Sequence, residues 1–203
     1  MKNIFYTIIL SLSVISLFSF INHSNKVNAN TNNSTVYWTG SKPAGSHSGN
    51  VSLKDGYLLF DHGRLVGGNF TIDMTSITCT DLEPDRGGNK LVGHLKNEDF
   101  FDVDKFPEAN LNITKVKKLN DQEYEMTGDM TIKGITKKID FNTELKLSGR
   151  TKSGWKSYTA VSKLIIDRTE WGIEYSSKKV LGALADKFIY DDMELDIFLV
   201  SEK

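Results

Sequence analysis

The stretch that decides the fold is QEYEMTGDMTIKGITKKIDFNTELKLS, residues 122–148. Its large apolar residues occupy even positions before the Lys133–Gly134 dipeptide and odd positions after it. Alternation with a period of two is typical of a β-strand that has one buried and one solvated face. We therefore predict one long antiparallel hairpin. Its buried face comprises Tyr124, Met126, Met130, Ile132, Ile139, Phe141, Leu145 and Leu147.

A two-residue turn at Lys133–Gly134 fixes the register of this hairpin. It places Met126 opposite Phe141 and Gly128 opposite Ile139. Directly opposed residues share a face, so the switch from even to odd numbers is what this register requires. Two strands of about ten residues each are long for a globular protein. They favour a barrel or a sandwich with a substantial interior.

The rest of the chain is predicted to be strands with turns between them and a single helix. Turn signals include a Gly- and Ser-rich stretch over residues 40–49 and a hairpin-type Asp55–Gly56 dipeptide. The helix is predicted over Asn89–Asn97, with Asn89 as its cap. The loop that follows carries Phe100 and Phe101, which we expect to fold back over a barrel opening. About eight strands without βαβ alternation indicate an all-β, antiparallel eight-stranded barrel.

The N-terminal residues have the pattern of a signal peptide. Lys2 precedes an apolar run from Ile4 to Ile21, and Val27-Asn28-Ala29 is a small-residue cleavage pattern. We expect residues 1–29 to be removed, 30–35 to be a flexible leader, and 36–203 to form the barrel. An uncleaved membrane anchor is the competing interpretation. The expected location is periplasmic or secreted, with no stable membrane span after cleavage. The single cysteine, Cys79, excludes an internal disulfide.

Several ordered motifs together resemble the YceI-like family over residues 35–200. They are Lys42…His47-Ser-Gly49, Gly67–Met74, His94…Asp99-Phe-Phe-Asp…Phe106-Pro107, Gly128–Thr136 and Ile166-Asp-Arg-Thr169…Gly172-Ile173. The resemblance implies an extended, lipocalin-like barrel that binds polyisoprenoid or other long-chain lipids in an apolar channel. It also implies export, because many members are periplasmic.

Residues alone leave a tunnel and a filled core equally open, because an eight-stranded barrel can hold either packed side chains or one slim ligand. The family resemblance favours the tunnel. We expect a Phe at Gly128 to block it while leaving the fold largely intact. The expected ligand-binding residues are Phe70, Ile72, Met126, Gly128, Met130, Ile139, Phe141, Leu145, Leu95 and Phe100.

The case for catalysis is weak. His47 and His94, with Asp81 or Asp99, form a metal or acid–base site only if their loops converge, and the two histidines are 47 residues apart. Structural hydrogen bonding, or a polar contact at the cavity mouth, is the favoured interpretation. Hydrolase, phosphate-loop and dinucleotide motifs are missing from the sequence, so we expect no catalytic residue, metal or cofactor.

Three functions remain at this stage. The favoured one is an exported, non-enzymatic protein that encloses a long-chain lipid. The second is a hydrolase or lipid-modifying enzyme that uses His47 and His94. The third is a structural barrel whose outer face binds a protein. A net charge of −1 without a polybasic stretch argues against nucleic acid. Asp167–Arg168 is expected to fix a loop by an ion pair rather than to hold an anionic headgroup. The oligomeric state is open, with a homodimer as one option.

Overall fold

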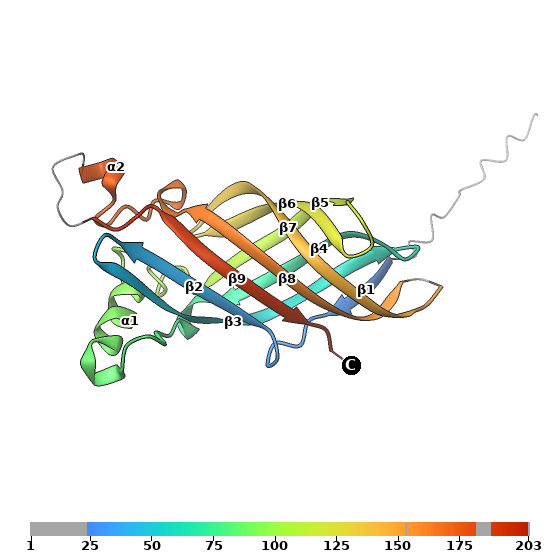
Figure 1. Cartoon of the computed structure of the whole chain (residues 1–203), viewed down its shortest axis with the longest axis horizontal. Helices are drawn as coiled ribbons and strands as arrows, with labels where there is room; N and C mark the ends of the chain where they lie inside the picture. Colours follow the sequence, from blue (N-terminus) through green and yellow to red (C-terminus); the bar gives the residue numbers. More distant parts are fainter. Residues whose placement is uncertain (1–23, 153, 182–187, 203) are drawn as a thin grey trace, which may run out of the picture.

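The computed structural model describes residues 24–152, 154–181 and 188–202 (Figure 1). Within these residues the chain forms nine strands, two helices and three 3₁₀ turns. The strands are β1 (Ser24–Asn28), β2 (Thr35–Lys42), β3 (Gly45–Asp61), β4 (Arg64–Asp73), β5 (Glu108–Lys118), β6 (Glu123–Ile132), β7 (Ile135–Arg150), β8 (Trp155–Asp167) and β9 (Asp192–Val200). The helices are α1 (Gly88–Lys96) and α2 (Lys178–Leu181), and the turns are η1 (Met74–Ser76), η2 (Pro84–Arg86) and η3 (Arg168–Trp171).

Strands β2 to β9 close into an eight-stranded antiparallel ring, as predicted. The sheet order is β1-β3-β2-β9-β8-β7-β6-β5-β4, and β3 also pairs with β4. The ring closes through β3, which is 17 residues long. Its first part pairs with β2 over Gly45–Val51, and its later part pairs with β4 over Ser52–Asp61. The strands cross the long axis of the molecule obliquely, which gives an extended barrel (Figure 1).

The central hairpin has the predicted register. Met126 pairs with Phe141 and Gly128 with Ile139, on either side of the turn at Lys133–Gly134. Both turn residues have positive φ, 50° and 75°. Such backbone angles match the right-handed twist of the strands, and glycine adopts them without steric cost. β7 is 16 residues long and ends at Arg150, two residues beyond the predicted hairpin.

A ninth strand is the main departure from the predicted barrel. β1 pairs antiparallel with β3 from Ser24↔Asp61 to Asn28↔Tyr57, and Val27 is buried. These residues belong to the segment 1–29 that the sequence predicts to be a cleaved signal peptide, and residues 1–23 of that segment lie outside the described part of the chain. Residues 30–35, expected to be a flexible leader, begin as a hydrogen-bonded turn: the backbone NH of Asn33 donates to the Asn30 carbonyl oxygen at 3.2 Å.

One predicted turn is shorter than expected, residues 43–44, and another is wrong. Residues 40–49 are mostly strand, with Gly40 paired with His47 across the β2–β3 hairpin. The Asp55–Gly56 dipeptide lies inside β3, next to a register shift after Leu53. A Cβ on Gly56 would lie 2.3 Å from Cδ1 of Phe70, so glycine here admits an aromatic ring against the backbone instead of turning the chain.

The helical pieces lie together at one end of the barrel (Figure 1). The predicted helix is α1, within one residue of its expected bounds. Asn89 does not cap it: the cap residue is Gly87, with φ of 112° and no side-chain cap hydrogen bond. The short α2 is an additional helix beyond the single one predicted.

Candidate ligand-binding cavity

The inner faces of the ring strands surround an apolar cavity of about 150 Å³. It follows from the alternation within each strand, since every second side chain points inward. All eight ring strands contribute to its wall, together with Leu95 of α1 and with Phe100 and Phe101 of the loop after it. The wall is almost wholly hydrocarbon and aromatic carbon, the composition typical of a site for an apolar ligand.

Eight of the ten residues predicted to bind ligand line this cavity. They are Phe70, Ile72, Leu95, Phe100, Met126, Met130, Phe141 and Leu145. Gly128 and Ile139 are not part of the lining. A Cβ on Gly128 would lie 2.8 Å from Cδ1 of Leu111 and 3.1 Å from the carbonyl oxygen of Asn112, so another side chain already covers this glycine. A Phe at Gly128 would therefore have to displace the Leu111 side chain, so this position is a less direct plug than the sequence predicts.

The cavity is long and narrow. Its wall runs along β9 from Met193 to Leu199, six residues apart, with every second side chain lining it. At about 3.3 Å per residue, this is ~20 Å of strand. A volume of about 150 Å³ is small for that length. The shape fits a slim chain rather than a compact metabolite.

Aromatic side chains close the end that carries the helices. Phe100 and Phe101 are buried, as the sequence analysis expected of a capping loop. The His94 ring meets Phe100 and Tyr175 edge-on, with centroid separations of 4.9 and 4.6 Å. Tyr175 comes from the segment between η3 and α2, so two distant stretches of sequence meet over the cavity end.

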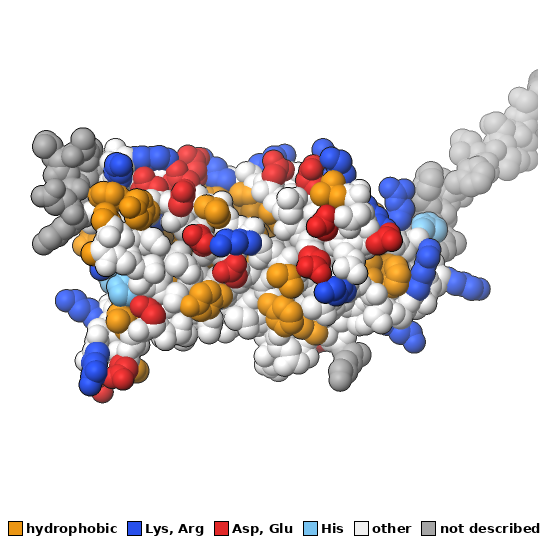
Figure 2. Space-filling model, viewed as in Figure 1, with side chains coloured by type: hydrophobic (Ala, Val, Ile, Leu, Met, Phe, Trp, Pro, Cys, Tyr) orange, Lys and Arg blue, Asp and Glu red, His pale blue; other side chains and the backbone are white. Residues whose placement is uncertain are grey.

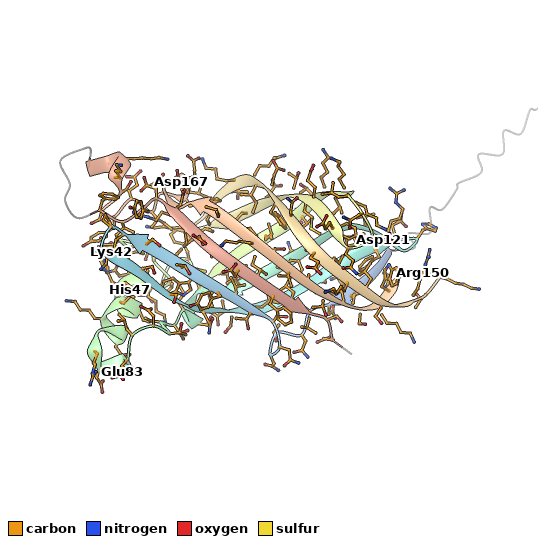
Figure 3. All side chains as sticks on the ribbon, in the orientation of Figure 1. Lys42, His47, Glu83, Asp121, Arg150 and Asp167 are labelled. Carbon is orange, nitrogen blue, oxygen red and sulfur yellow. The ribbon has the colours of Figure 1, made fainter. Side chains whose placement is uncertain are left out.

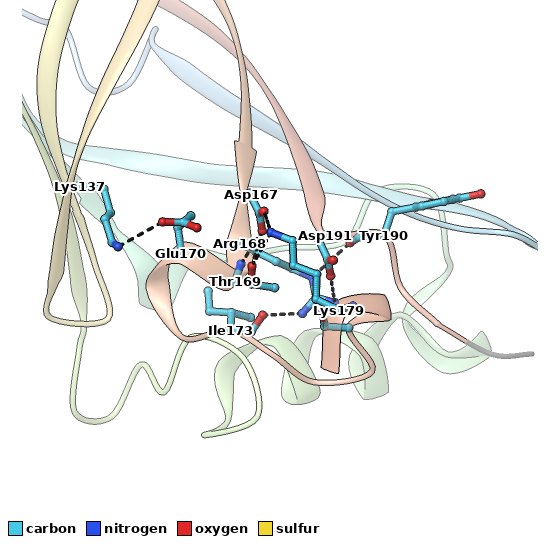
Figure 4. Close-up of polar contacts among 10 residues, drawn as sticks. Lys137, Asp167, Arg168, Thr169, Glu170, Ile173, Lys179, Tyr190 and Asp191 are labelled. Atoms are coloured by element: carbon cyan, nitrogen blue, oxygen red, sulfur yellow. Dashed lines mark hydrogen bonds and ion pairs between the residues drawn. The ribbon is translucent and has the colours of Figure 1, made fainter. Parts of the chain in front are cut away.

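At the same end, the side chain of Arg168 joins separate stretches of backbone by hydrogen bonds (Figure 4). The side chain is only 4% exposed. Its Nη1 donates to the carbonyl oxygen of Ile173 at 2.7 Å, and its Nη2 and Nε donate to those of Ile189 and Tyr190, both at 3.2 Å. Nη2 also lies 3.6 Å from Oδ1 of Asp191. Burial lowers the pKa of the guanidinium, although the carboxylate of Asp191 opposes this.

Asp167 and Arg168 do not pair with each other in the way their sequence suggested. Asp167 accepts a hydrogen bond from Nζ of Lys179 and caps η3 through the backbone NH of Thr169, at 3.0 Å. Partial burial disfavours the carboxylate of Asp167, but the hydrogen bonds from Lys179 and Thr169 outweigh it and lower its pKa. Both residues fix loops, as favoured from sequence, with other partners than expected. The nitrogens of Arg168 all bind protein oxygens, so this pair offers little to an anionic headgroup.

The two histidines belong to separate pairs. Nδ1 of His47 lies 2.8 Å from Oδ2 of Asp81, and Nε2 of His94 lies 3.0 Å from Oδ2 of Asp99. His47 lies at the same end as Lys42, Glu83 and Asp167, opposite Asp121 and Arg150 (Figure 3). Among the described residues, neither a hydrogen bond nor a ring contact joins the two pairs.

The Asp81 carboxylate anchors a loop on β3. Burial disfavours its charged form. Hydrogen bonds from the backbone NH of Ser48 and from the side chains of His47 and Cys79 outweigh this effect and lower the pKa of Asp81 to about 2. Burial and the hydrogen bond to Asp81 raise the pKa of the Cys79 thiol, which makes it a poorer nucleophile. In the described part of the chain, no group of three or more His, Cys, Asp or Glu side chains is placed to hold a metal ion.

Several residues that line the cavity are not among those predicted from the sequence. Trp38 and Thr143 lie on inner faces whose alternation was readable, and strand parity would have found them. Ile189, Tyr190 and Arg168 reach the cavity from irregular backbone, where no periodicity reports direction.

The outer face of the barrel is mixed in character. Figure 2 shows hydrophobic groups interspersed with charged side chains on the face that it presents. Val161 and Phe198 oppose each other on β8 and β9, and each is more than two-fifths exposed. No helix within the described residues has the length and apolar character to cross a bilayer.

The chain is similar in sequence to a family of known proteins. A model of the YceI-like domain matches residues 26–200. Protein YceI of Shigella flexneri is 35% identical over 103 residues, which are 50% of this chain and 49% of that protein. The chain thus spans about half the length of the curated relatives it matches.

Solved structures of other proteins share the fold. BcnA of Burkholderia cenocepacia superposes with a TM-score of 0.64 at 18% identity, covering 86% of this chain and 99% of that one. A polyisoprenoid binding domain from Saccharophagus degradans gives a TM-score of 0.62 at 14% identity, covering 86% and 97%. At these identities the likeness concerns the fold alone. Since the family model spans the ring strands and their cavity, this chain belongs to the YceI-like domain family.

Proposed function

We propose that the protein is an exported, non-enzymatic binding protein that encloses a long-chain lipid, such as an isoprenoid, in its barrel. The observation that carries this proposal is the apolar cavity inside a closed ring, with a wall drawn from every ring strand. The structural likeness to a polyisoprenoid binding domain and the family membership support the same ligand class. Export to the periplasm or the medium rests on the signal-like pattern of residues 1–29.

Hydrocarbon burial would supply the affinity. Each CH₂ group that leaves water contributes about 0.8 kcal/mol, against the cost of immobilising the chain. The cavity of about 150 Å³ is smaller than the ~300 Å³ at which ordinary ligand sites begin. A long chain therefore enters only as wall side chains move aside. Met126, Met130 and Met193 line the cavity, and flexible thioether side chains suit this adjustment.

The enzymatic alternative finds no supporting geometry. His47 and His94 each bind a different aspartate, and neither is among the residues that line the cavity. Alanine at both positions is expected to leave lipid uptake unchanged. Turnover of a bound lipid ester that disappears in this double variant would establish the enzyme instead.

Adjacent residues on β8 provide a matched test. Ala160 is buried in the cavity wall, while Val161 is exposed on the outer face. We expect Ala160→Phe to fill the cavity and to abolish uptake of a long-chain isoprenoid by the delipidated protein. Overpacking costs about 1–3 kcal/mol, so circular dichroism should still show a folded barrel. Val161→Phe is expected to bind as the unmodified protein does. Equal uptake by folded Ala160→Phe would refute binding in this cavity.

A further inference from the structure

Two hydroxyl groups interrupt the apolar wall of the cavity. Thr143 on β7 and Ser162 on β8 are directly opposed in the sheet register. They are 5% and 8% exposed, and both line the cavity. Ser162 precedes Asp167, the last residue of β8, by five residues, so the pair lies about 17 Å along the strand from the end at which Arg168 lies. The other polar lining groups, Arg168, Tyr190 and Asp192, belong to that end.

The two hydroxyls bind each other. Their oxygens are 2.7 Å apart, and Oγ1 of Thr143 also lies 3.7 Å from Sδ of Met126. Between them the hydroxyls have two protons to donate and several lone pairs. Within the described residues, these two contacts are the hydrogen bonds that the two side-chain hydroxyls make.

Either arrangement of the protons leaves one donor for a better acceptor. If Thr143 donates to Ser162, the proton of Ser162 is left for the cavity. If Ser162 donates to Thr143, the proton of Thr143 is held only by a thioether sulfur, which is a weak acceptor. An oxygen atom of a ligand would bind either proton more strongly than the protein does.

We propose that Thr143 and Ser162 form a hydrogen-bonding site within the channel that selects long-chain lipids carrying an acceptor oxygen, such as a carbonyl, over pure hydrocarbons. The inference rests on the proposed function and adds a chemical preference to it. A pair that served only to join β7 to β8 would show no such preference.

The test measures competition between two probes, hexadecane and 8-hexadecanone. The delipidated protein is equilibrated with an equimolar mixture, and the bound ratio is measured by gas chromatography after solvent extraction. Thr143→Val and Ser162→Ala are combined so that no hydroxyl loses its partner alone. The matched control combines Thr131→Val and Thr136→Val, whose hydroxyls are also 2.7 Å apart but on the exposed face.

We expect the bound ketone-to-alkane ratio to fall about threefold to tenfold in the interior double variant, the loss of one hydrogen bond. The exterior double variant should keep the ratio of the unmodified protein. An unchanged ratio in the interior variant would overturn the site while leaving lipid binding intact. A folded, unmodified protein that takes up neither probe would instead overturn the proposed function itself.

An infrared spectrum keeps the proposal testable if the interior variant does not fold. In the unmodified protein, the carbonyl stretch of bound 8-hexadecanone should shift to lower wavenumber than in liquid hexadecane. A carbonyl band at the hexadecane position would contradict the proposal.

Discussion

Arg168 is the residue on which the closed end of the barrel depends most. Replacing it by Met removes the donor to three backbone carbonyls and leaves the carboxylate of Asp191 buried without its cation. Removing one partner of a buried charged pair costs about 3–5 kcal/mol. We expect a loss of that order in the free energy of unfolding, measured by urea denaturation.

The control for this variant is Lys137→Met. Lys137 forms an ion pair with Glu170 at 3.2 Å nearby, with a side chain that is 41% exposed (Figure 4). Exposed ion pairs contribute about 0–1 kcal/mol. Equal losses in both variants would contradict the role given to Arg168.

Asp81 should make stability depend on pH in the acid range. Its folded-state pKa is about 2, below its ordinary value of 3.8, so the ionised form stabilises the fold. That contribution is complete above the ordinary pKa and is lost as the pH falls towards the folded value. We expect Asp81→Asn to flatten the decline in unfolding free energy between about pH 4 and pH 2.

Urea titrations across this pH range measure the effect. The fully exposed Asp121 is the control position, and Asp121→Asn should keep the slope of the unmodified protein. An Asp81→Asn variant that declines as steeply as the unmodified protein would contradict the assignment.

The sequence correctly predicted which residues face the interior wherever apolar and polar residues alternate along a strand. Met126 and Phe141 could be placed on the inner face because strand parity fixes which side a residue occupies. Odd or even position does not show which side chains of adjacent strands lie next to a residue, so it could not show that the Leu111 side chain covers Gly128. The partners of Arg168 are backbone carbonyls on irregular segments, and sequence carries no signal for them.

The first strand is the element whose presence has the largest consequence. β1 buries Val27 and pairs with five residues at the end of β3. Cleavage after Ala29 would remove it and leave one edge of that part of β3 unpaired, while the other edge stays paired with β4. A buried valine alone contributes about 1.5–3 kcal/mol. We therefore expect a chain that starts at Asn30 to be at least ~2 kcal/mol less stable to urea than one that starts at Ser24.

The same argument makes a prediction about processing. The YceI-like match begins at residue 26, inside β1. We expect the exported chain to begin at or before Ser24, which the intact mass of protein from culture would measure. Equal stability of the two truncated chains, with a mass that starts at Asn30, would show that β1 is dispensable.

The ring contacts among His94, Phe100 and Tyr175 should affect the rate of lipid release more than the stability of the fold. Tyr175 is 42% exposed and rests on His94 and Phe100. Each such ring contact contributes about 0.5–1.5 kcal/mol. We expect Tyr175→Ala to release a bound lipid about twofold to tenfold faster, by stopped-flow transfer to vesicles, with a small change in unfolding free energy. An unchanged release rate would mean that the chain leaves by another route.

The structure contains a strand, β1, that the sequence did not predict, and it lacks the turn predicted at Asp55–Gly56. The signal-like pattern ends in residues that also suit a strand, so cleavage and pairing compete for β1. The Asp55–Gly56 dipeptide is typical of a hairpin turn, but here the missing side chain of Gly56 makes room for the ring of Phe70. The long hairpin and α1 were predictable because their periodicity extends over many residues.

At the scale of the whole molecule, closure of the ring is what makes a channel. The pairing of eight strands encloses the space, the length of the strands sets its depth, and the side chains of Phe100, Phe101 and Arg168 restrict one end of it. The sequence predicted the barrel, but it could not distinguish a tunnel from a filled core. That distinction depends on how side chains from all eight strands meet, which no local pattern contains.

Native mass spectrometry of the protein, purified without detergent from its own cells, tests the central claim most directly. We predict one long-chain lipid per chain, recovered by solvent extraction and missing from Ala160→Phe purified in parallel. An unmodified protein that carries no lipid, and that takes up none of the long-chain lipids offered to it, would contradict the account.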